Sequence, residues 1–127
     1  MIKKMILAIM TSALLLLSAI TSADTVSQVW RCTLNEGKTV EDAQAINAEW
    51  LKRARELAGT DAITSTYVTA AVGDVGGFMW VDTFPDFTTW AKLMDAEPDE
   101  EIDAAFDELQ TCEGSRLLQG QPTEPAK

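Results

Sequence analysis

Two cysteines constrain the fold of this chain more than any other feature. Cys32 and Cys112 are the only cysteines, and they lie near opposite ends of the sequence. If they form a disulfide, the first and last structural elements must be neighbours in space. Whether they do depends on the compartment in which the protein folds, because disulfides persist in oxidising environments.

The N-terminal segment predicts that compartment. Lys3 and Lys4 precede a nearly unbroken apolar run over residues 5–20, and small residues lead to a cleavage point before Asp24. This pattern is typical of a secretory signal peptide. A retained membrane anchor is the alternative, but the run falls short of the roughly 20 residues that span a bilayer. We therefore expect residues 1–23 to be removed and the protein to be periplasmic or secreted.

Export favours a structural disulfide between Cys32 and Cys112. The alternative is a redox-active or nucleophilic thiol. A redox-active pair more often has close spacing in the sequence, and a thiolate nucleophile is usually paired with a histidine, of which the chain has none.

Composition excludes several classes of function. Without histidine, Ser-His-Asp triads, Cys-His dyads and His-ligated haem are unavailable. Ten basic residues against twenty acidic ones give a net charge of −10, which disfavours nucleic acid and anionic membranes as partners. Acidic residues alternate from Asp95 to Asp103, but Glu100 and Phe106 stand where a calcium loop requires Gly and Glu. The run indicates a solvated helix start, and we predict neither a metal nor a cofactor.

Hydrophobic patterning predicts two helices. Apolar residues at three- and four-residue spacing, with Thr39 as a cap and Gly59 as a stop, predict a helix over residues 40–58. A second helix follows Pro85, and Pro98 divides it into two parts. Runs rich in β-branched and aromatic residues predict four strands, at residues 26–34, 63–72, 78–84 and 115–119.

The resulting order is β-α-β-β-α-β, which predicts a ferredoxin-like α+β fold. In this fold the sheet is antiparallel with strand order 4-1-3-2, and both helices cover one face. The fourth strand then runs beside the first, which brings Cys32 close to Cys112. The cysteines thus support the topology independently. We expect the domain to comprise residues 24–120, followed by a flexible tail over residues 121–127.

With this element order, the segment VWRCTL followed by Gly37 and the aromatic segment GFMWVDTFPDFTTWAKL resemble the dimeric α+β-barrel superfamily. That superfamily includes antibiotic-biosynthesis-type monooxygenases, chlorite-dismutase-like proteins and NIPSNAP-like proteins. The resemblance implies a homodimer in which two open sheet faces meet, often around a ligand cavity. It assigns no catalytic residue, because haem-binding members use a histidine and no motif of the cofactor-free oxygenases maps onto this chain.

Strand alternation suggests which residues form the functional face. Successive side chains on a strand point to opposite faces of the sheet. We predict that one set of residues shares the face without helices: Arg31, Tyr67, Phe78, Trp80 and Asp82. On this face Arg31 and Asp82 are expected to form an ion pair. This face is either a pocket for an anionic or carbonyl-bearing ligand or a closed dimer interface, and interfaces are enriched in Trp, Tyr and Arg.

Two classes of function follow from the sequence. The favoured prediction is an exported, non-catalytic dimeric module that binds a ligand or partner through the open sheet face. The alternative is a cofactor-free, monooxygenase-type enzyme acting on a small aromatic or carbonyl substrate. In that case Asp82 and Tyr67 are the candidate proton-transfer groups, and either needs a strongly shifted pKa to act near neutral pH.

Overall fold

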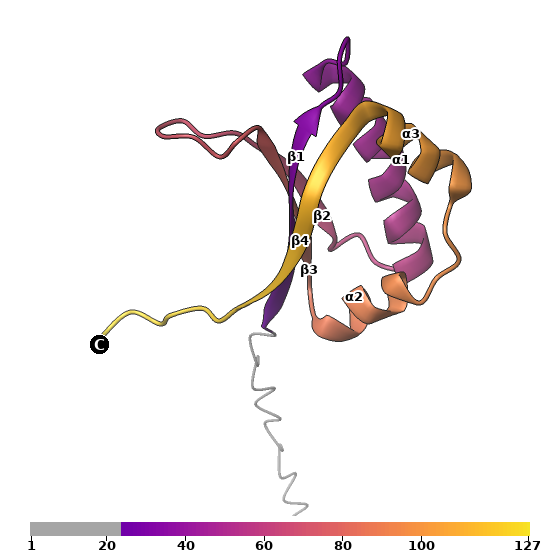
Figure 1. The fold of residues 1–127 in the computed structure, drawn as a ribbon. Helices are drawn as coiled ribbons and strands as arrows, with labels where there is room; N and C mark the ends of the chain where they lie inside the picture. Colours follow the sequence, from indigo (N-terminus) through magenta and orange to yellow (C-terminus); the bar gives the residue numbers. More distant parts are fainter. Residues whose placement is uncertain (1–23) are drawn as a thin grey trace, which may run out of the picture.

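A computed structural model describes residues 24–127 of the chain. The predicted signal peptide, residues 1–23, lies outside the described residues. Seven elements follow one another within the described part (Figure 1). They are β1 (Thr25–Leu34), α1 (Val40–Ala58), β2 (Thr64–Val68), β3 (Phe78–Phe84), α2 (Phe87–Met94), α3 (Glu100–Leu109) and β4 (Gln110–Gly120).

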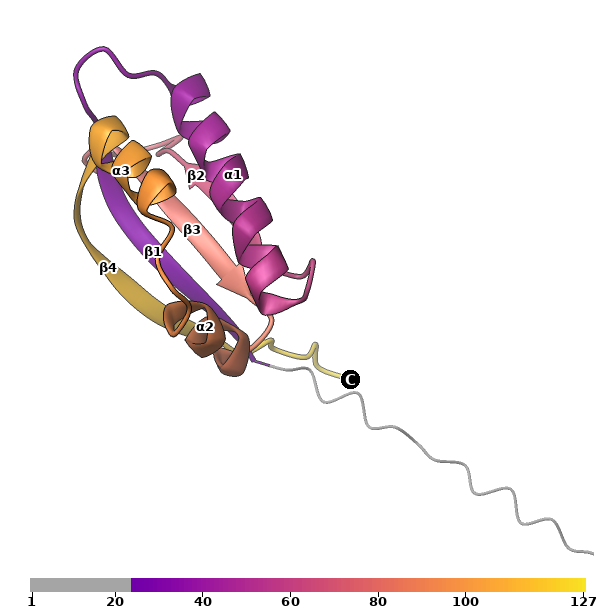
Figure 2. The same ribbon diagram turned by 90° about the vertical axis from the view of Figure 1, so that its right-hand side faces the viewer.

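The four strands form one antiparallel sheet in the order β2-β3-β1-β4. Figures 1 and 2 show the helices on one side of this sheet, while the other face is open. The predicted ferredoxin-like α+β fold is confirmed, including its strand order. Pro98 separates α2 from α3, so the second predicted helix is two short helices.

The first helix has the predicted bounds because both of its ends are well specified. The backbone N–H of Asp42 donates to Thr39 Oγ1, and the backbone N–H of Thr39 donates to Asp42 Oδ2, which completes a capping box. The hydrogen bonds that Thr39 donates to the ionised carboxylate, first of all from its backbone N–H, lower the pKa of Asp42. At the other end, Gly59 adopts a left-handed conformation with φ of 71°.

The acidic run marks the start of α3. Asp99 caps this helix by accepting a hydrogen bond from the backbone N–H of Ile102, and Glu100, Glu101 and Asp103 occupy the first turn. Carboxylates there interact favourably with the positive end of the helix dipole. The run is therefore the helix start that the sequence predicts.

The disulfide between Cys32 and Cys112 is present and joins residues 80 positions apart. The two residues are direct partners in the β1–β4 ladder, where a register irregularity separates them from the pair formed by Trp30 and Ser115. β4 is longer than predicted, because it begins directly at the end of α3 rather than near residue 115. β2 is shorter than predicted and ends at Val68.

The turn between β2 and β3 requires glycine at one position. Gly77 has φ of 129°, and a Cβ atom there would lie 2.3 Å from the carbonyl oxygen of Cys32. This distance is far below van der Waals contact, so only glycine lets the turn pass so close to β1. The turn thereby fixes where β3 enters the sheet.

The predicted assignment of residues to sheet faces is wrong for β3. Phe78, Trp80, Asp82 and Phe84 are buried and lie under the helices, not on the open face. Tyr67 shares their side, because it pairs with Trp80 across β2 and β3 and its ring packs on theirs. Of the predicted set, Arg31 alone is on the open face, where it pairs with Glu113 of β4.

Candidate functional site

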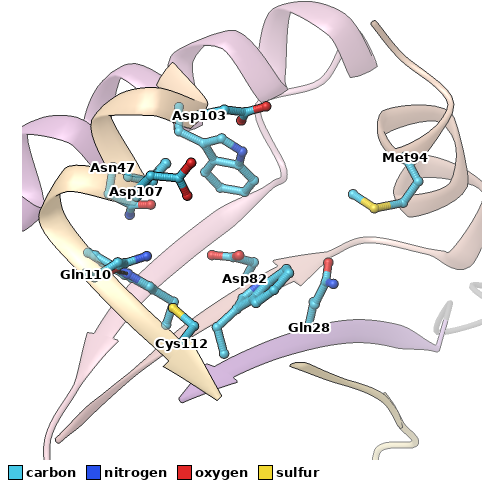
Figure 3. Close-up of a pocket in the computed structure, with 12 residues that line it drawn as sticks. Gln28, Asn47, Asp82, Met94, Asp103, Asp107, Gln110 and Cys112 are labelled. Atoms are coloured by element: carbon cyan, nitrogen blue, oxygen red, sulfur yellow. Dashed lines mark hydrogen bonds between the residues drawn. The ribbon is translucent and has the colours of Figure 1, made fainter. Parts of the chain in front are cut away.

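A cavity of about 390 Å³ lies between the sheet and the helices. Its sheet side is formed by Gln28, Trp30, Trp80 and Asp82, and its helix side includes side chains from α1, α2 and α3. Figure 3 shows Asp103 and Asp107 extending from α3 on one side and Asp82 and Gln28 on the other. Ligand cavities of this volume, with mixed aromatic and polar walls, are common in small proteins that bind small molecules.

A second hollow of about 620 Å³ runs along the end of α1 and the turn after it. It is lined by residues such as Lys52, Glu56 and Thr60 and contains no aromatic side chain. Its lining is that of a solvated surface, so the cavity under the helices is the candidate site.

Asp82 is the buried carboxylate of the cavity, with only 6% of its surface exposed. Its position follows from strand alternation, because Phe78, Trp80 and Phe84 on the same strand supply the core and Asp82 shares their face. A chain of hydrogen bonds holds it. Asn47 Nδ2 of α1 donates to Ser65 Oγ at 2.9 Å, and Ser65 Oγ donates to Asp82 Oδ1 at 2.5 Å.

Burial raises the pKa of Asp82 from 3.8 to about 6, although the hydrogen bond from Ser65 opposes the shift. Removing a carboxylate from water disfavours its charged form. A carboxyl group with a pKa near 6 can both accept and release a proton close to neutral pH. Such perturbed groups in a cavity are candidates for function.

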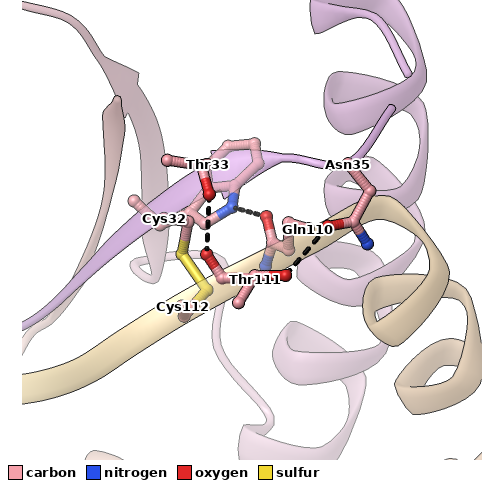
Figure 4. Close-up of a disulfide and its surroundings, with 7 residues drawn as sticks. Cys32, Thr33, Asn35, Gln110, Thr111 and Cys112 are labelled. Carbon is pink, nitrogen blue, oxygen red and sulfur yellow. Dashed lines mark hydrogen bonds between the residues drawn. A yellow bond between two sulfur atoms is a disulfide. The ribbon is translucent and has the colours of Figure 1, made fainter. Parts of the chain in front are cut away.

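Trp80 is fixed by a hydrogen bond to the start of β4. Its indole Nε1–H donates to Gln110 Oε1 at 2.9 Å (Figure 4). Gln110 is the first residue of β4, and the disulfide at Cys112 follows two positions later. Thr111 extends this network, because its hydroxyl donates to Asn35 Oδ1 at 2.8 Å. The disulfide therefore holds one wall of the cavity in place.

Three of the predicted site residues form an aromatic cluster. The rings of Tyr67 and Phe78 stack with centroids 4.4 Å apart, and Trp80 meets both rings edge-on at 5.2 and 5.6 Å. Burial raises the pKa of Tyr67. Of the predicted residues, Trp80 and Asp82 line the cavity, whereas Tyr67 and Phe78 support Trp80 from the side.

Arg31 does not join the site. It lies opposite Met79 in the β1–β3 ladder, whereas Asp82 lies opposite Gln28. The two predicted partners therefore belong to opposite faces, and the predicted ion pair between them is wrong. Its actual partner, Glu113, is exposed like Arg31 itself.

Several polar residues of the cavity were not predicted from the sequence. Asn47 lies within the apolar stripe of α1, between Ala43 and Trp50, and a polar residue on a buried helix face is a detectable signal. Gln28 occupies the buried face of β1 and accepts a hydrogen bond from the indole of Trp90 at 3.2 Å. Asp103 and Asp107 could not be separated from the general acidity of α3 by sequence.

Residues 24–127 contain no group of three or more His, Cys, Asp or Glu side chains that could hold a metal ion. None of the helices in the same range is long and apolar enough to cross a membrane.

Comparison with known proteins places the fold. No protein-family model matches the sequence, and a search of curated proteins finds no match. Among solved structures, SnoaB, a cofactor-independent oxygenase from Streptomyces nogalater, is 17% identical with a TM-score of 0.55, covering 82% of this chain and 100% of that chain. The hydroxynitrile lyase from Passiflora edulis is 14% identical with a TM-score of 0.49, covering 84% of this chain and 99% of that chain.

A third structure is a dabb family protein with a ferredoxin-like fold from Mesorhizobium loti. It is 11% identical with a TM-score of 0.43, covering 80% of this chain and 99% of that chain. At these sequence identities the similarity concerns the fold alone. The conclusion about the fold rests on the similarity to SnoaB. The predicted resemblance to the dimeric α+β-barrel superfamily is thus supported for the fold alone, which this chain shares with SnoaB.

Proposed function

We propose that this protein binds a small molecule in the cavity between the sheet and the helices. The observation that carries the proposal is a buried carboxylate, Asp82, on the wall of a cavity of about 390 Å³ that also has aromatic walls. This proposal replaces the open sheet face as the ligand site, because the aromatic and acidic residues predicted there lie under the helices.

The proposal is tested by mapping fragment binding with NMR. A mixed set of aromatic alcohols, acids and amines is titrated into the labelled protein. We expect shifts at amides of residues around the cavity and weaker shifts in Phe106→Trp, whose larger ring takes up part of the cavity. Phe87→Trp is the matched control, because Phe87 is 55% exposed and outside the cavity. Fragment shifts confined to the open face contradict the proposal.

A second candidate function is proton transfer, and the raised pKa of Asp82 favours it. Oδ2 of Asp82 would accept a proton from a carbon next to a carbonyl group. The electron pair of the broken C–H bond would form a C=C bond, and the π pair of the carbonyl group would move to its oxygen, which gives an enolate. Such a step needs no oxidant or cofactor. An acid with a pKa near the working pH suits general acid–base catalysis. The similar fold of a cofactor-independent oxygenase is compatible with this candidate.

Deuterium exchange tests this second function. Phenylacetone in D₂O should exchange its α-protons faster with the protein than without it, and the rate should rise with pH around a midpoint near 6. Asp82→Asn should remove the acceleration while Glu101→Gln retains it. Equal rates with the wild type and Asp82→Asn contradict a catalytic role for Asp82.

We further propose that the protein is exported and works as a homodimer. The disulfide supports folding in an oxidising compartment. An intact mass that begins at Asp24 would agree with export, and a mass that retains the leader would contradict it.

The open face carries half-buried apolar residues such as Val29 and Val81, which a second copy would cover. Val81→Asp should then convert a sedimenting dimer to a monomer.

A further inference from the structure

The cavity has an unbalanced charge. Three carboxylates line it, from Asp82 on β3 and from Asp103 and Asp107 on α3, and its lining contains neither Lys nor Arg. No salt bridge engages any of these three carboxylates within residues 24–127. Charges of one sign in a cleft with low-dielectric walls create a focused potential. This potential favours a positively charged occupant.

The position of Asp107 is not explained by helix stability. It lies in the last turn of α3, where the helix dipole is negative and no basic residue is present. Asp103 is four residues earlier on the same face, and like charges at this spacing repel each other. Both effects act against Asp107, whereas Asp103 lies in the favourable first turn of the helix. The position of Asp107 is therefore better explained by something it faces in the cavity.

Asp82 supplies an independent observation at the opposite wall. The side chain is more than nine-tenths buried, and Ser65 occupies only its Oδ1 atom. Within the described chain Oδ2 accepts no hydrogen bond, yet every fully buried side-chain oxygen there has a partner. Oδ2 is therefore open to the cavity. A carboxylate oxygen that faces a cavity with a free acceptor position can accept a hydrogen bond from a ligand or water.

Aromatic side chains complete the lining. Trp30, Trp50, Trp80 and Phe106 border the same space as the carboxylates. The faces of aromatic rings attract cations, and tryptophan does so most strongly. The same rings also cover apolar ligand surface. Carboxylates and indoles together match a ligand that carries both a positive charge and an apolar body.

We propose that the ligand of this cavity is an organic cation, an amine or quaternary ammonium group attached to an aromatic or alkyl body. This inference rests on the proposed function, since it specifies the ligand of the same cavity. Within the described residues these carboxylates do not form a group that could hold a metal ion. An ammonium group with an attached apolar body is large enough to reach both the α3 carboxylates and the indoles.

The test uses three ligands of one shape and different charge: phenethylamine, 2-phenylethanol and phenylacetate. Isothermal titration calorimetry at pH 7.5 measures their affinities for the wild type. We expect the amine to bind at least about tenfold more tightly than the alcohol, the value of one net charge-assisted contact, and phenylacetate to bind most weakly. Of the three ligands, only the amine should bind more weakly when the salt concentration is raised.

Matched variants assign the effect to the cavity. Asp103→Asn with Asp107→Asn removes two lining carboxylates and should bring the amine within about threefold of the alcohol. Glu101→Gln with Glu108→Gln removes the same charge from α3 outside the cavity and should keep the preference. If all three ligands bind equally well and Phe106→Trp weakens each of them, the inference of a cationic ligand is overturned but the proposed function stands. No saturable binding of any ligand contradicts both.

Discussion

The two faces of the sheet differ in how their charges are handled. On the helix-covered face, Phe78, Trp80 and Phe84 are buried together with the single carboxylate of Asp82. On the open face, Arg31 and Glu113 form an ion pair in which both side chains are more than half exposed. The covered face thus carries an isolated charge in a core, whereas the open face carries a paired charge in water.

This difference shows which force set the orientation of β3. Burying an aromatic side chain stabilises a protein by about 1.5–3 kcal/mol, and three of them share the covered face with Asp82. The cost of burying Asp82 is about 3 kcal/mol, judged from its raised pKa. Three aromatic residues outweigh one carboxylate, so the strand turns Asp82 inward. Pairing Arg31 with Asp82 would have gained at most about 1 kcal/mol at an exposed site.

The largest expected effect comes from comparing two single variants at adjacent positions of β3, one on each face of the sheet. Trp80→Ala should destabilise the protein by about 3–5 kcal/mol, because it leaves a cavity and frees Gln110 from its hydrogen bond. Val81→Ala, on the open face, should cost about 1 kcal/mol. Urea unfolding monitored by circular dichroism measures both. Similar costs at the two positions would mean that the faces do not differ as described.

The disulfide gives the next largest effect. Joining residues 80 positions apart restricts the unfolded chain and stabilises the fold by about 4 kcal/mol in the chain-entropy treatment, and by about 2–4 kcal/mol in typical proteins. Reduction should therefore lower the free energy of unfolding by an amount in this range. The Cys32→Ala/Cys112→Ala variant serves as the control, since reductant should leave its unfolding curve unchanged. Insensitivity of the wild type to reductant would remove the disulfide as a source of stability.

Replacing Asp82 should change the free energy of unfolding in the opposite direction, because the burial of its carboxylate destabilises the folded protein. Its pKa of about 6 in the folded protein exceeds the value of 3.8 expected when unfolded. The folded state then binds more protons between these values, so wild-type stability should fall as the pH rises from about 4 to about 6 and stay level above. Asp82→Asn, which keeps the acceptor for Ser65, should lack this slope and be more stable by up to about 3 kcal/mol at pH 7.

The unfolding free energy of both proteins, measured from pH 4 to pH 8, checks this prediction. Asp95→Asn is a suitable control, because Asp95 ends α2 outside the cavity. Parallel curves for the wild type and Asp82→Asn would show that burial of Asp82 carries no energetic cost. An Asp82→Asn variant that is less stable than the wild type at pH 7 would likewise show that burial of Asp82 carries no energetic cost.

Local signals predicted most of the fold, because each acts within a few residues. The capping box at Thr39, the break at Pro98 and the aromatic and β-branched residues over residues 78–84 each specify one element. The cysteines then specified which strands are neighbours. The face of β3 depends instead on register between strands far apart in the sequence, and the helix-facing position of Asp82 emerges only when Gln28 is known to lie opposite it.

The site was predicted in part for the same reason. Trp80 and Asp82 were identified because they alternate on one strand, yet the cavity also needs Asn47, Asp103 and Asp107 from two helices. Which helical side chains meet a given strand depends on how the helices pack on the sheet. No spacing in the sequence reports this arrangement.

The smallest expected effect concerns the ion pair of the open face. Arg31 and Glu113 have side chains that are 56% and 68% exposed, so water screens their attraction. A double-mutant cycle with Arg31→Ala and Glu113→Ala should give a coupling energy below about 1 kcal/mol that declines with added salt. If a homodimer covers the open face, the coupling should grow at protein concentrations where the dimer forms, because burial reduces screening. A coupling that is large and independent of concentration would mean that this pair, like Asp82, is held in a desolvated site.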